Sequence, residues 1–213
     1  MKIVFLFYEG MTALDAVGPL EILSRIPNAT VQRAALNTGL VNTDSGLFLN
    51  SEVPLSEISH ADILVIPGAG SATSLENFPE ILQWVASIHT TTLWTTSVCT
   101  GSLILGASGI LKGVKATTHW AAHERLQKWG AKPVHERVVV DGKVMTAAGV
   151  SAGIDMALAL TEKAAGLQVA QTLQLGLEYD PAPPFNTGSP EKAPKEMVAA
   201  LKKRMNASFE VSK

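Results

Sequence analysis

The chain has 213 residues, of which 46% are hydrophobic and 17% are charged. This composition excludes an intrinsically disordered chain, and the length suffices for one α/β domain with a large core. The formal net charge of -2 gives no electrostatic reason to expect nucleic acid or an anionic membrane as a partner. We therefore expect a single domain over residues 1–213 with neither kind of partner.

The location is predicted from the cysteine count and from the apolar runs. Cys99 is the only cysteine, so no internal disulfide can form and a reducing compartment fits. The apolar run after Met1 is too short for the core of a signal peptide, and no run approaches the length of a membrane span. We expect a protein of the cytoplasm.

Strand-like and helix-like segments alternate along the chain. Apolar and β-branched runs predict strands at residues 3–8, 31–36, 40–49, 61–66, 134–140, 143–147 and in the run that ends at Cys99. Helical patterns cover residues 12–25, 79–88, 151–165, 167–179 and 191–206, with Thr12 as a candidate N-cap. Turn residues interrupt the chain at 44–46 and at 141–142. The alternation predicts an α/β fold, with a mostly parallel sheet between helices and its site at the carboxyl ends of the strands.

Cys99 lies where a strand-like run changes into a helix-compatible one. The pattern Ser97-x-Cys99-x-Gly101 is similar to a nucleophile elbow, the G-x-nucleophile-x-G turn, with serine at the first position. Such a turn points the reactive side chain out of the sheet, and the start of the next helix favours the thiolate. The alternative is an inert core cysteine, because cysteine is among the most buried residue types. The strand-end position favours a catalytic nucleophile.

Two further segments follow predicted strands and belong to the same edge of the sheet. Asp15 lies in an otherwise apolar stretch, and is either on an exposed helix face or enclosed in the site. An enclosed carboxyl group would have a raised pKa and could share a proton. The turn at residues 67–70 has neither a P-loop ending nor a dinucleotide fingerprint. We expect the backbone N–H groups of Gly68 and Ala69 to face developing negative charge.

Two other motifs suggest chemistry but have simpler explanations. Gly149-x-Ser151-x-Gly153 matches the serine hydrolase pattern, but no histidine follows Ser151, so we expect this serine to cap a helix. His119 and His123 have a spacing used in zinc sites, but Trp120 stands where a zincin has glutamate. We expect no metal and no cofactor, and place His119 at the start of a helix with a hydrogen bond to its ring.

Together these segments resemble the ThiJ/PfpI superfamily over nearly the whole chain. The resemblance implies a flavodoxin-like fold, a homodimer, Cys99 as nucleophile, Asp15 as acid and a Pro-Gly-Ala turn. Asp15 stands where glutamate is common, Ala69 replaces a glycine, and Thr100 replaces the histidine of the protease-like branch. The chain is most similar to the isocyanide hydratase branch, and residues 14–19, 96–103, 116–120, 134–139 and 179–190 carry that similarity.

The resemblance implies that water adds to an isonitrile, R–N≡C, to give an N-substituted formamide. Cys99 would attack the terminal carbon, Asp15 would donate and accept protons, and Thr100 would offer its backbone N–H and hydroxyl. Val150 would supply an apolar wall for the organic group. Two alternatives remain. One is a non-catalytic small-molecule sensor like the regulator-type relatives, although only about one helix follows Pro190 here. The other is a glyoxalase or redox member of the superfamily.

Overall fold

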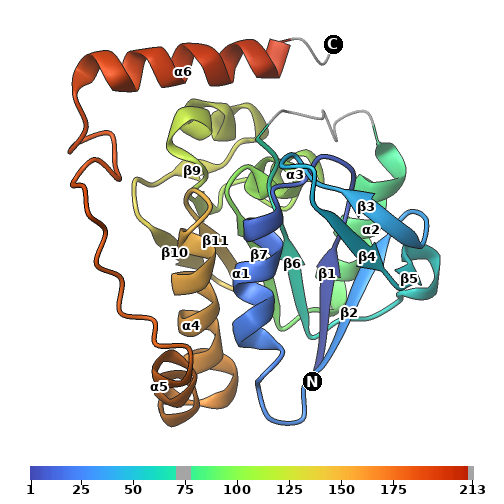
Figure 1. Ribbon diagram of the computed structural model, residues 1–213. Helices are drawn as coiled ribbons and strands as arrows, with labels where there is room; N and C mark the ends of the chain where they lie inside the picture. The colour runs from blue at the N-terminus through green and yellow to red at the C-terminus, as the bar shows by residue number, and fades with distance from the viewer. Residues whose placement is uncertain (71–77, 211–213) are drawn as a thin grey trace.

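The structure is a computed structural model, which describes residues 1–70 and 78–210. A seven-stranded sheet with the order β10-β11-β7-β6-β1-β2-β5 forms its centre (Figure 1). The strands are β1 (Lys2–Leu6), β2 (Thr30–Ala35), β5 (Val53–Pro54), β6 (Ile63–Ile66), β7 (Trp94–Val98), β10 (Val138–Asp141) and β11 (Val144–Ala147). Neighbouring strands are parallel except in the β10–β11 hairpin. The predicted mostly parallel sheet is confirmed.

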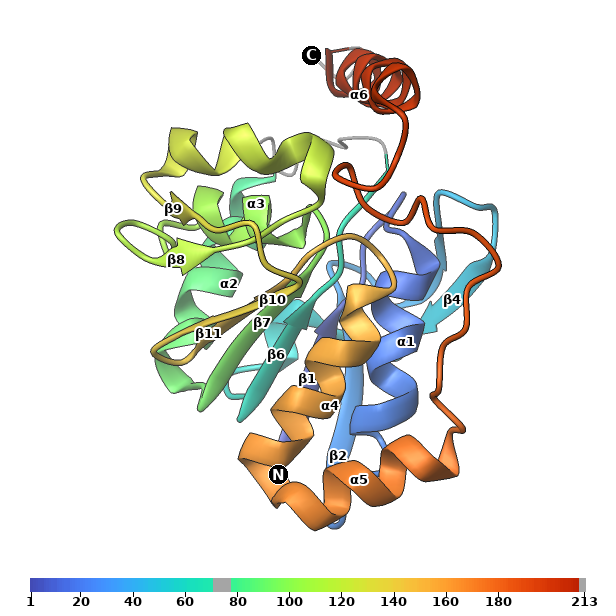
Figure 2. The same ribbon diagram turned by 90° about the vertical axis from the view of Figure 1, so that its left-hand side faces the viewer.

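Helices cover both faces of the sheet (Figure 2). One face carries α1 (Ala13–Leu23) and α4 (Ala152–Ala165), with α5 (Leu167–Gly176) packed against α4. The other face carries α2 (Pro79–Thr91), α3 (Gly101–Ala107) and the 3-10 helix η3 (Trp120–Trp129). Smaller elements are η1 (Leu55–Glu57) and the two-stranded sheets β3 (Gly39–Asn42) with β4 (Phe48–Ser51) and β8 (Lys115–Ala116) with β9 (Lys132–Pro133). The last helix, α6 (Lys195–Glu210), extends away from the sheet and meets η3 (Figure 1).

The central strands are buried on both sides, which explains their continuous apolar sequences. Every side chain of β6 is buried, as are the last four of β1. Small residues let the helices on one face approach each other and the sheet. A Cβ on Gly153 would lie 3.1 Å from Val98 and 3.2 Å from Pro19, and one on Gly18 would lie 3.1 Å from Ile154. The glycines of α1 and α4 therefore serve helix packing.

Three sequence predictions differ from the structure in detail. The strand predicted from residue 134 begins only at Val138, because the chain before it pairs elsewhere and the Val134 N–H donates to Ala116 O at 2.9 Å. The last helix begins four residues later than predicted, after Pro194, whose carbonyl accepts from Val198. Thr12 does precede α1, but its hydroxyl donates to Asp44 at 2.5 Å and makes no capping hydrogen bond to the backbone of α1.

The connections of the sheet reverse direction between β1 and β6. From β1 the chain continues to β2 on one side, and from β6 it continues to β7 on the other. The carboxyl ends of the strands at such a reversal are where open α/β sheets bind ligands. Asp15, Gly68 and Cys99 follow β1, β6 and β7, so the topology brings them to this edge. Among the described residues, no helix has the length and apolar character needed to cross a membrane.

Candidate active site

Cys99 occupies a tight turn between β7 and α3. Its φ of 56° lies in the left-handed region, which a residue with a side chain rarely adopts. Its N–H donates to Ala147 O at 3.1 Å and Ala148 O at 2.9 Å. Its carbonyl accepts from Thr118 Oγ1 at 3.0 Å and from Ser102 Oγ at 3.2 Å. These contacts hold the backbone in a conformation that is unfavourable by itself.

Gly101 explains why the turn can lie so close to the neighbouring strand. A Cβ at this position would lie 2.2 Å from Ile66 O and 2.9 Å from Pro67 O. Only glycine therefore fits at the first residue of α3. This is the physical basis of the glycine in the Ser97-x-Cys99-x-Gly101 pattern.

Asp15 lies in the first turn of α1 and is completely buried. Its Oδ2 accepts from the Gly68 N–H at 2.9 Å. Its Oδ1 has no hydrogen-bond partner among the described residues. Burial raises the pKa of Asp15 from 3.8 to about 7, while the Gly68 N–H and the adjacent Cys99 thiol lower it. The alternative of an exposed helix face is wrong, and the carboxyl group is enclosed in the site.

The Cys99 side chain is 3% exposed, and its surroundings oppose ionisation. Burial, followed by the negative charge of Asp15, raises the pKa of the Cys99 thiol to about 12. Hydrogen bonds from the Val150 and Thr100 N–H groups act in the opposite direction. The groups at the helix start thus act in the expected direction, toward the thiolate, but burial and the Asp15 charge outweigh them. Burial and the neighbouring Asp15 charge therefore favour the neutral thiol over the thiolate.

The turn at residues 67–70 supports the Asp15–Cys99 pair through hydrogen bonds to Asp15 and Thr100. The Gly68 N–H donates to Asp15, and the Ala69 N–H donates to Thr100 Oγ1 at 2.8 Å. Thr100 Oγ1 in turn donates to Ala69 O at 3.0 Å. A Cβ at Gly68 would lie 2.6 Å from Thr100 N and 2.9 Å from Asp15 Oδ2. The two N–H groups expected to face negative charge on a substrate are thus occupied, and they hold Asp15 and Thr100 instead.

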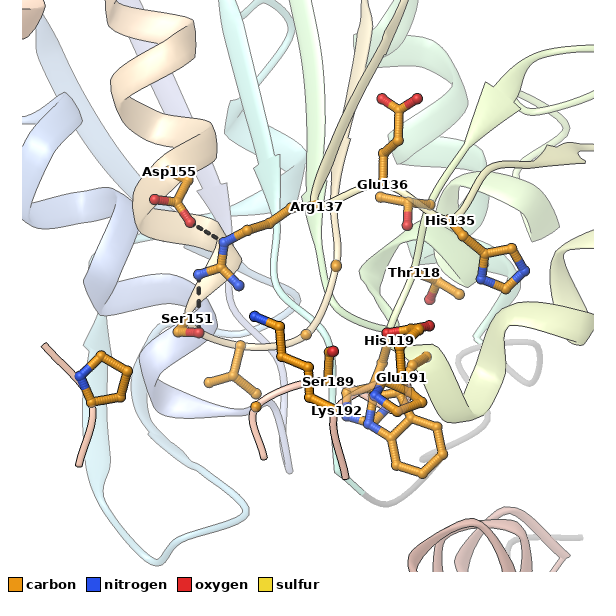
Figure 3. A pocket seen from close by; sticks show the side chains of 18 of the residues that line it. Thr118, His119, His135, Glu136, Arg137, Ser151, Asp155, Ser189, Glu191 and Lys192 are labelled. Carbon is orange, nitrogen blue, oxygen red and sulfur yellow. Dashed lines mark hydrogen bonds and ion pairs between the residues drawn. The ribbon is translucent and has the colours of Figure 1, made fainter. Parts of the chain in front are cut away.

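Val150 closes the other side of the sulfur. Its φ of 24° is strained for a β-branched residue, and its N–H interacts with the Cys99 sulfur. Val150 and Thr118 both line a cavity of about 1060 Å³ (Figure 3). The starts of η3 and α4, the segment before β10 and the chain around residues 179–192 form its walls. The cavity therefore begins next to two residues that bond Cys99.

Tyr8 is a site residue that the sequence analysis missed. It is 6% exposed, and its hydroxyl donates to Pro67 O at 2.8 Å. Burial, then the charges of Asp15 and Cys99, raises its pKa. Its position at the end of the first apolar run was the available signal, because that run ends at the same sheet edge as Asp15.

The histidines and Ser151 have structural contacts. His119 precedes η3, and its ring accepts from the Ala121 N–H at 3.2 Å, so the predicted hydrogen-bonded helix start is confirmed. His123 stacks on His135 with 3.6 Å between ring centroids. Within residues 1–70 and 78–210, no cluster of three histidine, cysteine or acidic side chains suits a metal ion. Ser151 precedes α4 but does not cap it, because its hydroxyl accepts from Arg137 at 3.2 Å.

Comparison with known proteins identifies the family. The profile of the DJ-1/PfpI family matches residues 1–163. The chain belongs to the DJ-1/PfpI family. An isonitrile hydratase of Pseudomonas putida is 39% identical over 211 residues, which are 99% of this chain and 92% of that protein. The HTH-type transcriptional regulator CdhR of Pseudomonas aeruginosa is 29% identical over 78% of this chain and 51% of its own length.

A solved DJ-1/PfpI structure agrees with the fold over almost the whole chain. The crystal structure of a ThiJ/PfpI family protein from Pseudomonas syringae matches with a TM-score of 0.90 and 36% identity. The match covers 97% of this chain and 89% of the other. The resemblance to the ThiJ/PfpI superfamily and the predicted flavodoxin-like α/β fold are confirmed.

Proposed function

We propose that the protein is an isocyanide hydratase, which adds water to an isonitrile and releases an N-substituted formamide. The observation that carries the proposal is the completely buried Asp15 carboxyl group, which is bonded to the Gly68 N–H and lies beside the Cys99 thiol. The identity of 39% with an isonitrile hydratase over 99% of the chain supports this choice of reaction. The same identity supports an enzyme that acts on a small-molecule substrate. Because the proposed reaction adds water to the isonitrile, we assign the enzyme to the hydro-lyases.

The first step forms a thioimidate on Cys99. The sulfur attacks the terminal carbon of R–N≡C while Asp15 takes the thiol proton, and this proton then moves to the same carbon. The product, R–N=CH–S–Cys99, contains all atoms of the thiol and the isonitrile. Because a free thiolate is scarce at a raised thiol pKa, attack depends on the adjacent carboxylate as proton acceptor.

The second step consumes water and restores the thiol. Asp15 removes a proton from water as its oxygen attacks the thioimidate carbon, and it returns the proton to the nitrogen. The resulting intermediate is R–NH–CH(OH)–S–Cys99. As its C–S bond breaks, the hydroxyl oxygen becomes the formyl oxygen, its proton passes to the sulfur, and R–NH–CHO leaves. A carboxyl group with a pKa of about 7 suits both roles, since it can lose and gain a proton near neutral pH.

The remaining site residues hold this pair in place. In our proposal, the N–H groups of Thr100 and Val150 stabilise negative charge on sulfur as it forms and departs. Gly68 and Ala69 orient Asp15 and Thr100 through the bonds described above. The Val150 side chain forms part of the wall for the organic group of the substrate.

We also propose that the enzyme works as a homodimer in the cytoplasm. Apolar side chains remain exposed on β3, β4 and α6, including Leu40, Phe48 and Leu201. The helix α6 also extends away from the sheet, where it meets η3 (Figure 1). A second copy that covers these groups would remove apolar surface from water. The single cysteine is consistent with a reducing compartment.

One assay separates this function from its alternatives. Wild-type protein mixed with p-nitrophenyl isonitrile should form the formamide, which absorbance reports, and should leave methylglyoxal unchanged. The similarity to a regulator favours a small-molecule sensor as the second candidate, and such a sensor would bind the isonitrile without turnover. Turnover of methylglyoxal but not of isonitriles would instead identify a glyoxalase and contradict the proposal.

A further inference from the structure

We infer that the cavity beside Val150 binds a carboxylate, and that Lys192 and Arg137 recognise it. The preferred substrates are then isonitriles that carry a carboxylate at the end remote from the N≡C group. This inference rests on the proposed function and specifies its substrate class.

The cavity is placed to receive the organic part of a molecule that reacts at Cys99. Its lining includes Thr118, whose hydroxyl bonds the Cys99 carbonyl, and Val150, whose N–H bonds the sulfur. Its volume of about 1060 Å³ far exceeds what an isonitrile carbon needs. Cys99 itself is not among the residues that line the cavity, and we infer that the substituent of a bound isonitrile passes Val150 to enter it.

Arg137 is fixed on one wall of this cavity. Its Nε donates to Asp155 and its Nη2 donates to Ser151 Oγ at 3.2 Å (Figure 3). The other oxygen of Asp155 accepts from the Tyr179 hydroxyl at 2.8 Å. A guanidinium group has five N–H donors, so Arg137 retains donors beyond these two bonds. The network thus holds a cation in a defined orientation, and both oxygens of its acidic partner are occupied.

Lys192 supplies a second cation from the opposite wall. Its ammonium group points toward the Arg137 guanidinium, and no dashed interaction reaches it from the residues drawn (Figure 3). Of the nearby acids, Glu136 points away from Lys192 in the same view, whereas Glu191 interacts with the charge of Lys192 and also accepts hydrogen bonds from its own N–H and from Ser189. Lys192 and Arg137 thus each have an acidic neighbour, and both present N–H donors to one space.

A carboxylate between these groups could accept hydrogen bonds from both. Arginine and lysine both donate charge-assisted hydrogen bonds to carboxylate oxygens, and the arginine fork suits a planar anion. The positive end of the α4 dipole adds to the effect, because Val150 and Ser151 at the start of α4 line the cavity. Since Lys192 is exposed, the preference should be moderate and should weaken with salt.

The test compares two substrates that differ in charge but share the aryl isonitrile. The ratio of kcat/KM for 4-isocyanobenzoate to that for methyl 4-isocyanobenzoate should exceed about five in wild-type protein at low salt. In Lys192→Met the ratio should fall to about one. Lys195→Met is the matched control, because Lys195 begins α6 outside the cavity lining, and it should keep the wild-type ratio. A wild-type ratio of one, or a ratio that Lys192→Met does not change, would overturn the inference.

A binding measurement separates this inference from the proposed function. Calorimetric titration with 4-formamidobenzoate and its methyl ester needs no turnover. Tighter binding of the acid that depends on Lys192 would support the carboxylate site even in a protein that hydrates neither isonitrile. Equal affinities would overturn the site, while turnover of the ester would still support the hydratase.

Discussion

The carboxyl group of Asp15 has one oxygen bonded to Gly68 N and one oxygen with no partner in the described structure, and Cys99 is the adjacent thiol. The free oxygen is an acceptor for the thiol proton. The same buried carboxylate that opposes ionisation of the isolated thiol therefore gives the sulfur a route to lose its proton as it attacks. Four predictions follow from this pair and its supporting turn.

Replacing Asp15 by asparagine should abolish turnover and stabilise the protein above about pH 7. Burial raises the pKa of Asp15 from 3.8 to about 7, so the folded protein binds this proton more tightly than the unfolded chain. Stability should fall as pH rises between those values, by about 4 kcal/mol for the wild type. Urea unfolding at about pH 4 and about pH 8 should show that Asp15→Asn lacks most of this fall.

The matched control for this experiment is Glu80→Gln on α2, which removes an exposed carboxylate. It should keep both the turnover and the pH dependence of the wild type. A stability curve for Asp15→Asn that coincides with that of the wild type would contradict a buried, destabilising charge at residue 15.

The alkylation rate of Cys99 should rise with pH through about pH 7 in the wild type. In this range Asp15 loses its proton and becomes able to accept one from the thiol. Iodoacetamide labelling followed by intact-mass measurement reports the rate, since the chain has one cysteine. Asp15→Asn should lack this rise. A wild-type rate that increases only with a pKa near 12 would show that the carboxylate gives the thiol no assistance.

Gly68→Ala should lower activity by about 10²-fold or more and destabilise the fold by about 1–3 kcal/mol. The added Cβ would lie 2.6 Å from both Thr100 N and Thr100 Oγ1, so the turn must move away from Asp15 and Thr100. Gly176→Ala at the end of α5 is the control, because its Cβ would meet nothing within 4 Å. Steady-state kinetics and thermal unfolding of both variants measure the losses of activity and stability. Equal losses in Gly68→Ala and Gly176→Ala would argue against a special role for Gly68.

Thr100→Val should destabilise the site, and Thr100→Ser should restore it. The Thr100 hydroxyl bonds both the N–H and the carbonyl of Ala69 in a buried turn. Valine leaves both groups unpaired, at a cost of about 1–3 kcal/mol. Denaturant unfolding measures this loss, and kcat should fall with it. If Thr100→Ser behaves like Thr100→Val, the hydroxyl contacts do not explain the effect.

The sequence was sufficient to bring Asp15, Gly68 and Cys99 together, because each follows a buried parallel strand and the topology collects such strand ends at one edge. The sequence was insufficient for hydrogen-bond partners and pKa values, because these depend on contacts between residues that are far apart in the chain. The occupied N–H groups of Gly68 and Ala69 depend on side chains far away in sequence. The raised thiol pKa depends on the depth of burial, which a strand-to-helix pattern does not report.

Local sequence patterns did not predict the walls of the cavity either. Residues 179–192 contain five prolines or glycines without periodicity, and only the folded chain shows that they lie opposite the start of α4. The unexpected 3-10 form of η3 likewise turns His123 toward His135 rather than onto one face with His119. These features arise from packing rather than from local preference.

The measurement that tests the central claim most directly is an intact-mass analysis of the protein during hydration of p-nitrophenyl isonitrile, made side by side on the wild type and Cys99→Ala. The wild type should carry a transient adduct with the mass of one isonitrile on residue 99 and should release the formamide. Cys99→Ala should show neither. Formamide production by Cys99→Ala at the wild-type rate would contradict the account.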